Sequence, residues 1–166
     1  MSYSMNDGMN VAKQATADIT SWLWSQSQTI KVQNVEQMPD FQRRDIDLIW
    51  TTQTGKVLVE IKGDRWHKTG NFFFETYSNR EKGTPGCFMY TEADWLFYYF
   101  VIPRTLYILP MPATREWFLP RIDEFPERST TTPVGRGYYT TIGRLVPIKT
   151  VMQQLNGVQK VTISPK

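Results

Sequence analysis

The sequence predicts a single mixed α/β domain, and three observations lead to this fold class. The chain has 166 residues, 40% of them hydrophobic, and is therefore long enough to bury one sizeable core. Its first apolar positions recur at helical spacing, whereas several later stretches alternate or form short apolar runs typical of strands. The two kinds of stretch are mixed along the chain, with neither an internal repeat nor a clear second domain.

The N-terminal part is predicted to contain a helix followed by a strand. A helix is expected over residues 10–27, because apolar side chains recur every three or four positions and Asn10 is a suitable N-cap. Residues 1–9 are expected to be flexible. Residues 30–35 alternate between apolar and polar side chains like a strand, and Pro39 breaks the pattern.

The next segment is predicted to form an antiparallel hairpin. Its two apolar runs, residues 45–50 and 57–62, are separated by the turn formers of residues 51–55. We expect the turn to be centred between Gln53 and Thr54, and this centre fixes which residues of the two strands face each other.

With this turn, four charged side chains gather on one face of the hairpin. Asp47 faces Glu60 and Asp45 faces Lys62, and side chains two apart on a strand share a face. Directly opposed Cβ atoms lie roughly 5 Å apart, close enough for two carboxylates to share one divalent cation. Because two carboxylates placed in this way repel each other unless a cation neutralises them, the hairpin is the candidate functional site.

The segments after the hairpin are assigned from their apolar patterns and from Gly and Pro. The aromatic run 71–77 is expected to be a strand, and the polar stretch 78–86 a mobile loop. A buried helix is expected over residues 95–101, because Thr91-Glu-Ala-Asp94 is a good helix start and Pro103 ends the apolar run.

The C-terminal third carries no functional motif. It is expected to contain a strand over 105–109, a helix over 113–122, a loop rich in Pro, Thr and Gly over 123–137, a strand over 138–148 and a helix over 150–155. Residues 159–166 are expected to be a frayed tail, so the single domain is predicted to span residues 10–158.

Composition and charge narrow the class of protein. The net charge of +3 and the pI near 9.0 are compatible with a polyanionic partner without requiring one. The single cysteine, Cys87, excludes an internal disulfide and suits a reducing compartment. No segment has the length of a membrane span and the first residues lack the parts of a signal peptide, so a cytoplasmic protein without membrane contact is expected.

The charged residues of the hairpin resemble a known family pattern. Asp47, then Glu60-Ile-Lys62 in the next strand, all preceded by a helix and a strand, resemble the PD-(D/E)XK nuclease superfamily of restriction endonucleases, archaeal Holliday-junction resolvases and one class of homing endonucleases. The twelve residues between Asp47 and Glu60 are similar to the resolvase spacing, and residues 69–75, Gly86 and 91–95 look like a pattern in small phage and bacterial members. The resemblance covers residues 10–110.

This resemblance implies a fold, an activity and a partner. The fold would be a three-layer α/β/α restriction-endonuclease-like domain around a mixed sheet of four or more strands. The protein would be a Mg²⁺-dependent DNA endonuclease, with Mn²⁺ as a substitute, and would commonly act as a homodimer. Asp47, Glu60 and the carbonyl of Ile61 would hold the metal ion, and Lys62 would hold or deprotonate the attacking water. The alternative for these charges is a solvated strand face with a cross-strand salt bridge.

Three further acids are candidates for supporting roles. Asp18 is the one acid of the predicted helix over residues 10–27 and is a candidate catalytic residue, since superfamily members often add an acid from the first helix. Asp45 and Glu75 are candidate supports of the site. The alternatives are a helix-edge Asp for Asp18, a charge partner of Lys62 for Asp45, and an ordinary exposed strand residue for Glu75.

Basic and polar residues on both sides of the hairpin are candidate DNA ligands. They would position the phosphate backbone without specifying sequence, or would simply be solvated, and they are Arg43, Arg44, Arg65, His67, Lys68 and Asn71. Two other functions stay open: a non-catalytic DNA-binding or assembly protein on the same fold, and a nuclease that acts on RNA.

Overall fold

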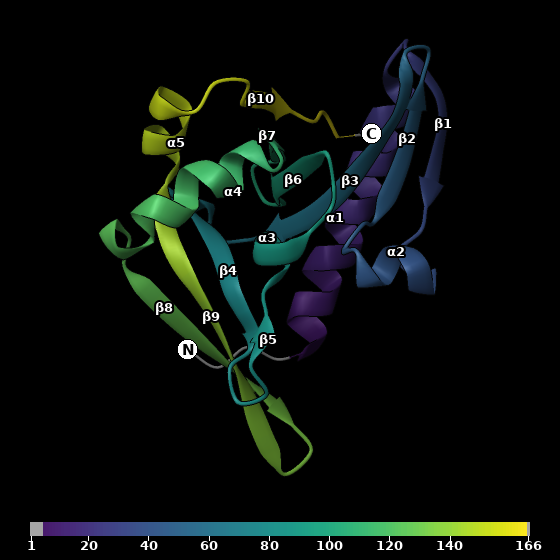
Figure 1. Ribbon diagram of the computed structural model, residues 1–166. Coiled ribbons are helices and arrows are strands. Elements are labelled where there is room, and N and C mark those ends of the chain that lie inside the picture. Colours follow the sequence, from purple (N-terminus) through teal and green to yellow (C-terminus); the bar gives the residue numbers. More distant parts are fainter. Residues whose placement is uncertain (1–4, 166) are drawn as a thin grey trace.

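The computed structural model describes residues 5–165 and mixes helices with strands along the chain (Figure 1). Its helices are α1 (Met5–Ser25), α2 (Pro39–Arg43), α3 (Cys87–Tyr90), α4 (Ala113–Phe118) and α5 (Ile148–Gln154), with 3₁₀-helices η1 (His67–Thr69) and η2 (Leu119–Glu124). Its strands are β1 (Thr29–Asn34), β2 (Leu48–Thr52), β3 (Gly55–Asp64), β4 (Asn71–Asn79), β5 (Thr84–Pro85), β6 (Trp95–Phe100), β7 (Thr105–Pro110), β8 (Glu127–Val134), β9 (Gly137–Pro147) and β10 (Gln159–Thr162).

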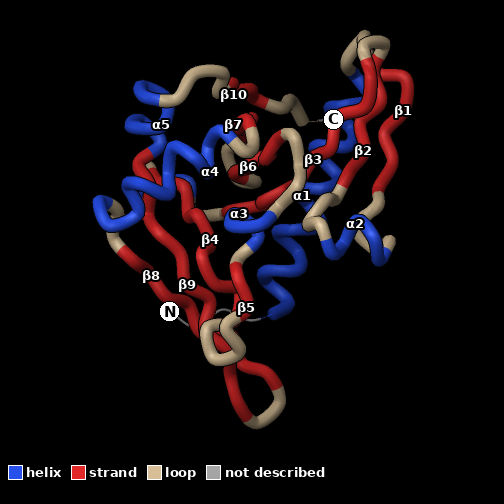
Figure 2. The backbone as a smooth tube through the Cα atoms, in the orientation of Figure 1, coloured by secondary structure: helices blue, strands red, loops and turns tan. Residues whose placement is uncertain are grey.

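The strands form two sheets, shown in red in Figure 2. The larger sheet has six strands in the order β1-β2-β3-β6-β7-β10, and the smaller sheet has four in the order β5-β4-β9-β8. In the larger sheet β3 and β6 run parallel and the other neighbours run antiparallel. The predicted mixed α/β class, with a mixed sheet of four or more strands, is therefore confirmed.

Helix α1 packs along one face of the six-stranded sheet. It buries an apolar stripe that includes Ala15 and Ile19 against Val59 of β3, and burial of this stripe stabilises the contact. The two elements approach closely at Gly63, where a Cβ atom would lie 3.0 Å from the Cβ of Ala15. Among the described residues, neither α1 nor any shorter helix is long and apolar enough to cross a membrane.

Both ends of the chain differ from the sequence prediction. Of the expected flexible segment 1–9, residues 5–9 belong to α1, and residues 1–4 lie outside the described residues. The expected frayed tail instead contains β10, in which Val161 pairs with Leu106 of β7. Alternating residues of this short segment give a weak pattern, and it becomes a strand because the edge of β7 is open for pairing.

The hairpin of β2 and β3 has the predicted register. Thr52 pairs with Gly55, so Gln53 and Thr54 form the turn, as predicted. Leu48 pairs with Val59, and just before this pair the N–H of Asp47 donates to the carbonyl of Val59 (2.9 Å), which places Asp47 next to Glu60. The side chains of Leu48 and Val59 contact the α1 side of the sheet, so by strand alternation the side chains of Asp47 and Glu60 point to the opposite side.

The prediction of a helix over residues 95–101 is wrong, because these residues form β6. Strand β6 lies between β3 and β7 in the sheet, and all its residues except Trp95 are buried. Such a fully buried run shows no alternation, so its pattern alone does not distinguish helix from strand. Asp94 does not cap a helix: its side chain accepts a hydrogen bond from the N–H of Leu58 (2.8 Å) and thereby joins the start of β6 to β3.

The predicted loop over residues 123–137 is also corrected in part, because residues 127–134 form β8. This strand pairs with β9 along its whole length. Consecutive threonines favour a strand, and Pro133 is tolerated because β8 is the edge of its sheet. The other predicted strands and helices are confirmed within a few residues of their ends, and the predicted loop over 78–86 contains the last two residues of β4 and the two-residue β5.

The face of the six-stranded sheet opposite α1 is covered by β4 and β9 of the second sheet together with α3, α4 and α5 (Figure 1). An aromatic core fills this space, with Phe74 of β4 stacked on Phe88 of α3 at 4.1 Å between ring centroids. This layer thus combines strands with short helices. The charged face of β3 points into this layer, which places the candidate site at its edge.

The approach of α3 to β4 requires a glycine and can be tested. At Gly86 a Cβ atom would lie 2.3 Å from the backbone oxygen of Glu75, whereas Gly8 in α1 has open space around it. We predict that Gly86→Ala lowers the free energy of unfolding by about 1–3 kcal/mol through overpacking. Gly8→Ala should raise it by about 0.5 kcal/mol, because alanine favours a helix. Urea unfolding of both variants checks this, and equal effects of the two substitutions would contradict it.

Candidate metal centre

Three carboxylates meet on the face of the six-stranded sheet that points away from α1. Glu60 lies in β3 and is only 6% exposed, Asp47 lies next to it just before β2, and Asp45 lies in the bend after α2. With the carboxylates ionised, Oε2 of Glu60 and Oδ2 of Asp45 are buried without a hydrogen-bond donor among residues 5–165. Buried carboxylate oxygens are costly without a donor or a cation, so this cluster is the candidate site.

Asp45 reaches the cluster because the backbone turns sharply after α2. Its φ angle of 54° is in the left-handed region, which Asp tolerates better than most residues. The turn is held by the Asp45 carbonyl, which accepts a hydrogen bond from Oγ1 of Thr91 (2.7 Å). Regular pairing with β3 begins only at Leu48, so Asp45 is not paired with Lys62 as predicted. The carboxylate of Asp45 instead lies beside that of Glu60.

Asp47 is fixed by three hydrogen bonds with two segments, β3 and the residue that follows β1. Its N–H donates to the carbonyl of Val59 (2.9 Å), and its own carbonyl accepts from the N–H of Val35 (2.8 Å). Its Oδ2 accepts from the N–H of Ile61 (2.8 Å). The main chain of Ile61 therefore borders the cluster through its N–H, and the role of its carbonyl as a metal ligand stays a prediction.

The cluster strongly favours protonated carboxyls or a bound cation. Burial raises the pKa of Asp45 to about 6, against the opposing effect of its hydrogen bond with Glu60. Burial also raises the pKa of Asp47, although the Ile61 N–H lowers it in part. The pKa of Glu60 is well above its usual value because of burial and of repulsion by Asp47 and Asp45. Three ionised carboxylates are therefore not stable here without a positive charge.

Lys62 forms an ion pair on the same face of β3. Its Nζ lies 3.3 Å from Oε2 of Glu75 in β4, and both side chains are mostly buried. Glu75 raises the pKa of Lys62 above its usual value, so the lysine is an ammonium group in this arrangement. The structure thus brings Glu75, a candidate support, to the site through Lys62. An ammonium group donates hydrogen bonds, so the alternative role of Lys62 as a base is disfavoured.

Helix α3 adds two residues that no sequence motif marks. Sγ of Cys87 and oxygens of Asp45 and Glu60 all lie within 4.8 Å of one another. Tyr90 is close enough that burial, with repulsion from Asp45, raises the pKa of its phenol to about 12. The one signal in the sequence is Gly86, which indicates a close backbone approach but not the partner.

Asp18 does not lie with the cluster. It is buried in α1, and its carboxylate accepts hydrogen bonds from the hydroxyl of Tyr99 (2.8 Å) and from Nη1 of Arg104 (3.1 Å). Because Tyr99 packs on the α1 side of the sheet, the sheet separates Asp18 from Glu60. Asp18 therefore joins α1 to β6 and to the loop before β7, and its predicted catalytic role finds no geometric support.

The candidate DNA ligands lie in two segments that flank the cluster. Arg43 and Arg44, at the end of α2, form ion pairs with Asp40 and Glu92, the latter at 2.9 Å. The other four candidates lie after β3. The guanidinium carbon of Arg65 lies 4.9 Å from the ring centroid of Trp66. His67 and Lys68 belong to η1, and Asn71 begins β4. Their contact with DNA stays a prediction.

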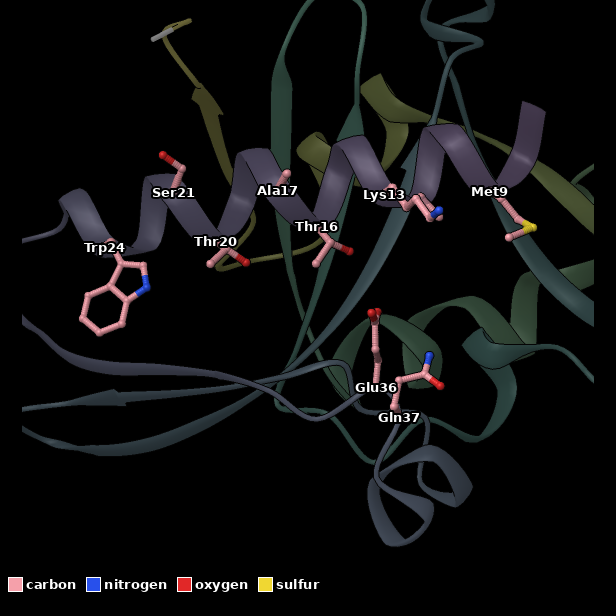
Figure 3. A pocket seen from close by; sticks show the side chains of 10 residues that line it. Met9, Lys13, Thr16, Ala17, Thr20, Ser21, Trp24, Glu36 and Gln37 are labelled. Carbon is pink, nitrogen blue, oxygen red and sulfur yellow. The ribbon is translucent and has the colours of Figure 1, made fainter. Parts of the chain in front are cut away.

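Two surface hollows are lined in part by residues that interact electrostatically with Lys62 or Asp47. A hollow of about 370 Å³ is lined by Glu75, Ser78, Asn79, Tyr139 and Thr141, and it borders the Lys62–Glu75 ion pair. A groove of about 620 Å³ lies between α1 and residues 36–37, with Trp24 and Lys13 on the helix and Glu36 facing it (Figure 3). Besides burial, repulsion by Glu36 contributes to the raised pKa of Asp47.

Binding of a divalent cation should stabilise the folded protein through Glu60. At about 100 times its Kd, Mg²⁺ or Mn²⁺ is expected to add about 2.7 kcal/mol, which raises Tm by roughly 5–10 °C. Glu60→Gln should abolish this rise, because the amide removes a charged ligand. The matched control is Glu124→Gln at an exposed position in η2. Thermal unfolding with cation or EDTA checks this, and an equal rise in all three proteins would contradict it.

The metal-free protein should lose stability as the pH rises. Because Asp45 and Glu60 have raised pKa values when folded, the unfolded chain releases their protons at lower pH than the folded protein does. The stabilisation is complete below pH 4 and is lost as the pH rises through about 6, by about 3 kcal/mol for Asp45 alone. Urea unfolding in EDTA at pH 5 and pH 8 measures this. A larger stability at pH 8, or an unchanged pH dependence in Glu60→Gln, would contradict it.

Known proteins provide no assignment for this chain. No protein-family model matches it, and no curated protein or solved structure matches it either. The superfamily relationship expected from Asp47, Glu60 and Lys62 stays a prediction.

Proposed function

We propose that the protein is a metal-dependent endonuclease that hydrolyses DNA phosphodiester bonds at the Asp47–Glu60–Lys62 face of the hairpin. One observation carries the proposal: two neighbouring carboxylates and a lysine share this face, and the carboxylate of Glu60 is buried with an oxygen that has no donor among residues 5–165. A purely structural cross-strand pair would place opposite charges against each other, whereas here the facing residues are both acids.

The donor set fits a magnesium ion. Carboxylate oxygens are the ligands that Mg²⁺ prefers, and a site with few carboxylates leaves positions for water and phosphate oxygens. Asp47 and Glu60 would hold the ion, together with the carbonyl of Ile61. When bound, the ion would supply positive charge to the phosphate and lower the pKa of a coordinated water.

The other residues of the site have roles that follow from their contacts. Lys62, kept protonated beside Glu75, would donate a hydrogen bond to the attacking water or to a phosphate oxygen and stabilise the negative charge that builds up. Glu75 is a positioning residue, since it acts on the substrate only through Lys62. The N–H of Ile61 orients Asp47, so one oxygen of that carboxylate stays available.

The substrate and the assembly are parts of the same proposal. The basic residues after α2 and after β3 would contact the DNA backbone from both sides of the hairpin. A two-fold dimer would match the symmetry of duplex or junction DNA. The order of α1, β1, β2 and β3 supports a PD-(D/E)XK member with a restriction-endonuclease-like core.

One observation favours a second candidate function. Lys62 forms an ion pair with Glu75, and the side chain of Glu60 is buried. A protein that keeps these charges only to hold its sheets together would bind DNA, or assemble with a partner, without cutting it. DNA cleavage separates the two candidates.

The cleavage test uses supercoiled, linear and four-way-junction DNA with Mg²⁺ or EDTA, and single- and double-stranded RNA as alternative substrates. We expect Mg²⁺-dependent cleavage of at least one DNA. Lys62→Ala should reduce the cleavage rate by about 10²-fold or more, since it removes the group that stabilises charge, with little loss of DNA affinity. The exposed Glu124→Gln is the control. Cleavage unaffected by Lys62→Ala, or no cleavage of any DNA, would contradict the proposal, and preferential cleavage of RNA would support the RNA-directed alternative.

A further inference from the structure

We propose that Asp45, Glu60 and Cys87 form a second cation position that binds a thiophilic divalent metal ion of the Zn²⁺ class. This position shares Glu60 with the proposed magnesium site and adds a sulfur ligand from α3. The proposal goes beyond the nuclease function, because a metal ion would bind here whether or not the protein cuts DNA.

The three ligand atoms converge. Sγ of Cys87 and carboxylate oxygens of Asp45 and Glu60 all lie within 4.8 Å of one another. An ion placed among three atoms at such distances lies no more than about 2.8 Å from each, and small side-chain movements bring it to the usual 2.0–2.3 Å of Zn–O and Zn–S bonds. A water molecule would complete four-coordinate geometry.

Glu60 provides an independent indication of a ligand. Its side chain is only 6% exposed, and when the carboxylates are ionised its buried Oε2 has no hydrogen-bond donor among residues 5–165. The buried Oδ2 of Asp45 likewise lacks a hydrogen-bond donor among residues 5–165. Two neighbouring carboxylate oxygens without donors are the groups that a cation would satisfy.

The thiol is placed by packing from both ends of α3. The N–H of Gly86 donates to the carbonyl of Thr76 in β4 (2.9 Å). After the helix, Oγ1 of Thr91 donates to the carbonyl of Asp45, so one contact fixes α3 to the backbone of a proposed ligand. Between these ends, Phe88 is buried in the aromatic core. The position of Cys87 beside the two carboxylates therefore does not depend on a mobile loop.

The chemistry of the donor set selects the class of metal ion. A thiolate with two carboxylates is softer than the all-oxygen set that Mg²⁺ prefers, so Zn²⁺, Co²⁺ and Cd²⁺ are favoured. Binding exchanges the thiol proton for the cation, and the released proton goes to solvent. Two carboxylates and a thiolate then carry three negative charges, and the ion neutralises two of them, whereas Lys62 is already paired with Glu75.

The test uses Co²⁺ as a spectroscopic probe on the full chain in a buffer without thiols or chelators. Because Cys87 is the single cysteine, a thiolate-to-Co²⁺ charge-transfer absorption can come from this residue alone. We expect the absorption to saturate at one Co²⁺ per chain and to be lost in Cys87→Ser. Asp45→Asn should weaken Co²⁺ binding by roughly ten-fold or more, and the exposed Glu124→Gln should bind like the unchanged protein.

The outcomes separate this proposal from the nuclease proposal. The absence of the charge-transfer absorption would overturn the metal position, and so would equal Co²⁺ affinity in Asp45→Asn, which would mean that the thiol binds alone. If Cys87→Ser does not fold, as judged by circular dichroism, the unchanged protein and Asp45→Asn still decide. If the charge-transfer absorption appears but no DNA is cleaved, the metal position is supported and the nuclease proposal fails. If DNA is cleaved but the absorption is absent, the nuclease proposal is supported and the metal position fails.

Discussion

The repulsion among three buried carboxylates is the constraint on which the rest of the site depends. Asp45, Asp47 and Glu60 lie on one face of a hairpin under a second layer of structure, where burial and mutual repulsion disfavour ionisation. A folded chain keeps such a group only with protons or with a cation. The proposed nuclease activity and the proposed second cation position both depend on the cation.

The fold explains how these acids are held together. The hairpin register brings Asp47 opposite Glu60, the bend after α2 turns Asp45 inward, and the contact of α3 with β4 covers them. The same layer supplies two further ionisable groups. Glu75 forms the ion pair with Lys62, and the thiol of Cys87 lies beside the carboxylates of Asp45 and Glu60. Because the two sheets meet beside the cluster, a change in their packing changes the site.

Local features were predictable from the sequence, and contacts between distant segments were not. The register of Asp47 and Glu60 follows from a two-residue turn, which a short stretch of sequence specifies. The strand β6 was predicted as a helix because a fully buried apolar run has no period. Asp18 is a candidate through the resemblance to a superfamily whose first helix often adds an acid, but the sequence does not tell which face of the sheet α1 covers. Cys87 reaches the cluster only through the packing of α3, so no spacing in the sequence predicts it.

The most direct measurement of the central claim is the anomalous-scattering map of crystals grown with Mn²⁺. We expect a metal peak in contact with carboxylate oxygens of both Asp47 and Glu60, and its loss in crystals of Glu60→Gln. The contrary result is a well-defined cluster without a metal peak, in which the carboxyls of Asp45, Asp47 and Glu60 hydrogen-bond to one another through shared protons. That result would show that protons alone satisfy the buried acids, and the metal-dependent function would be excluded.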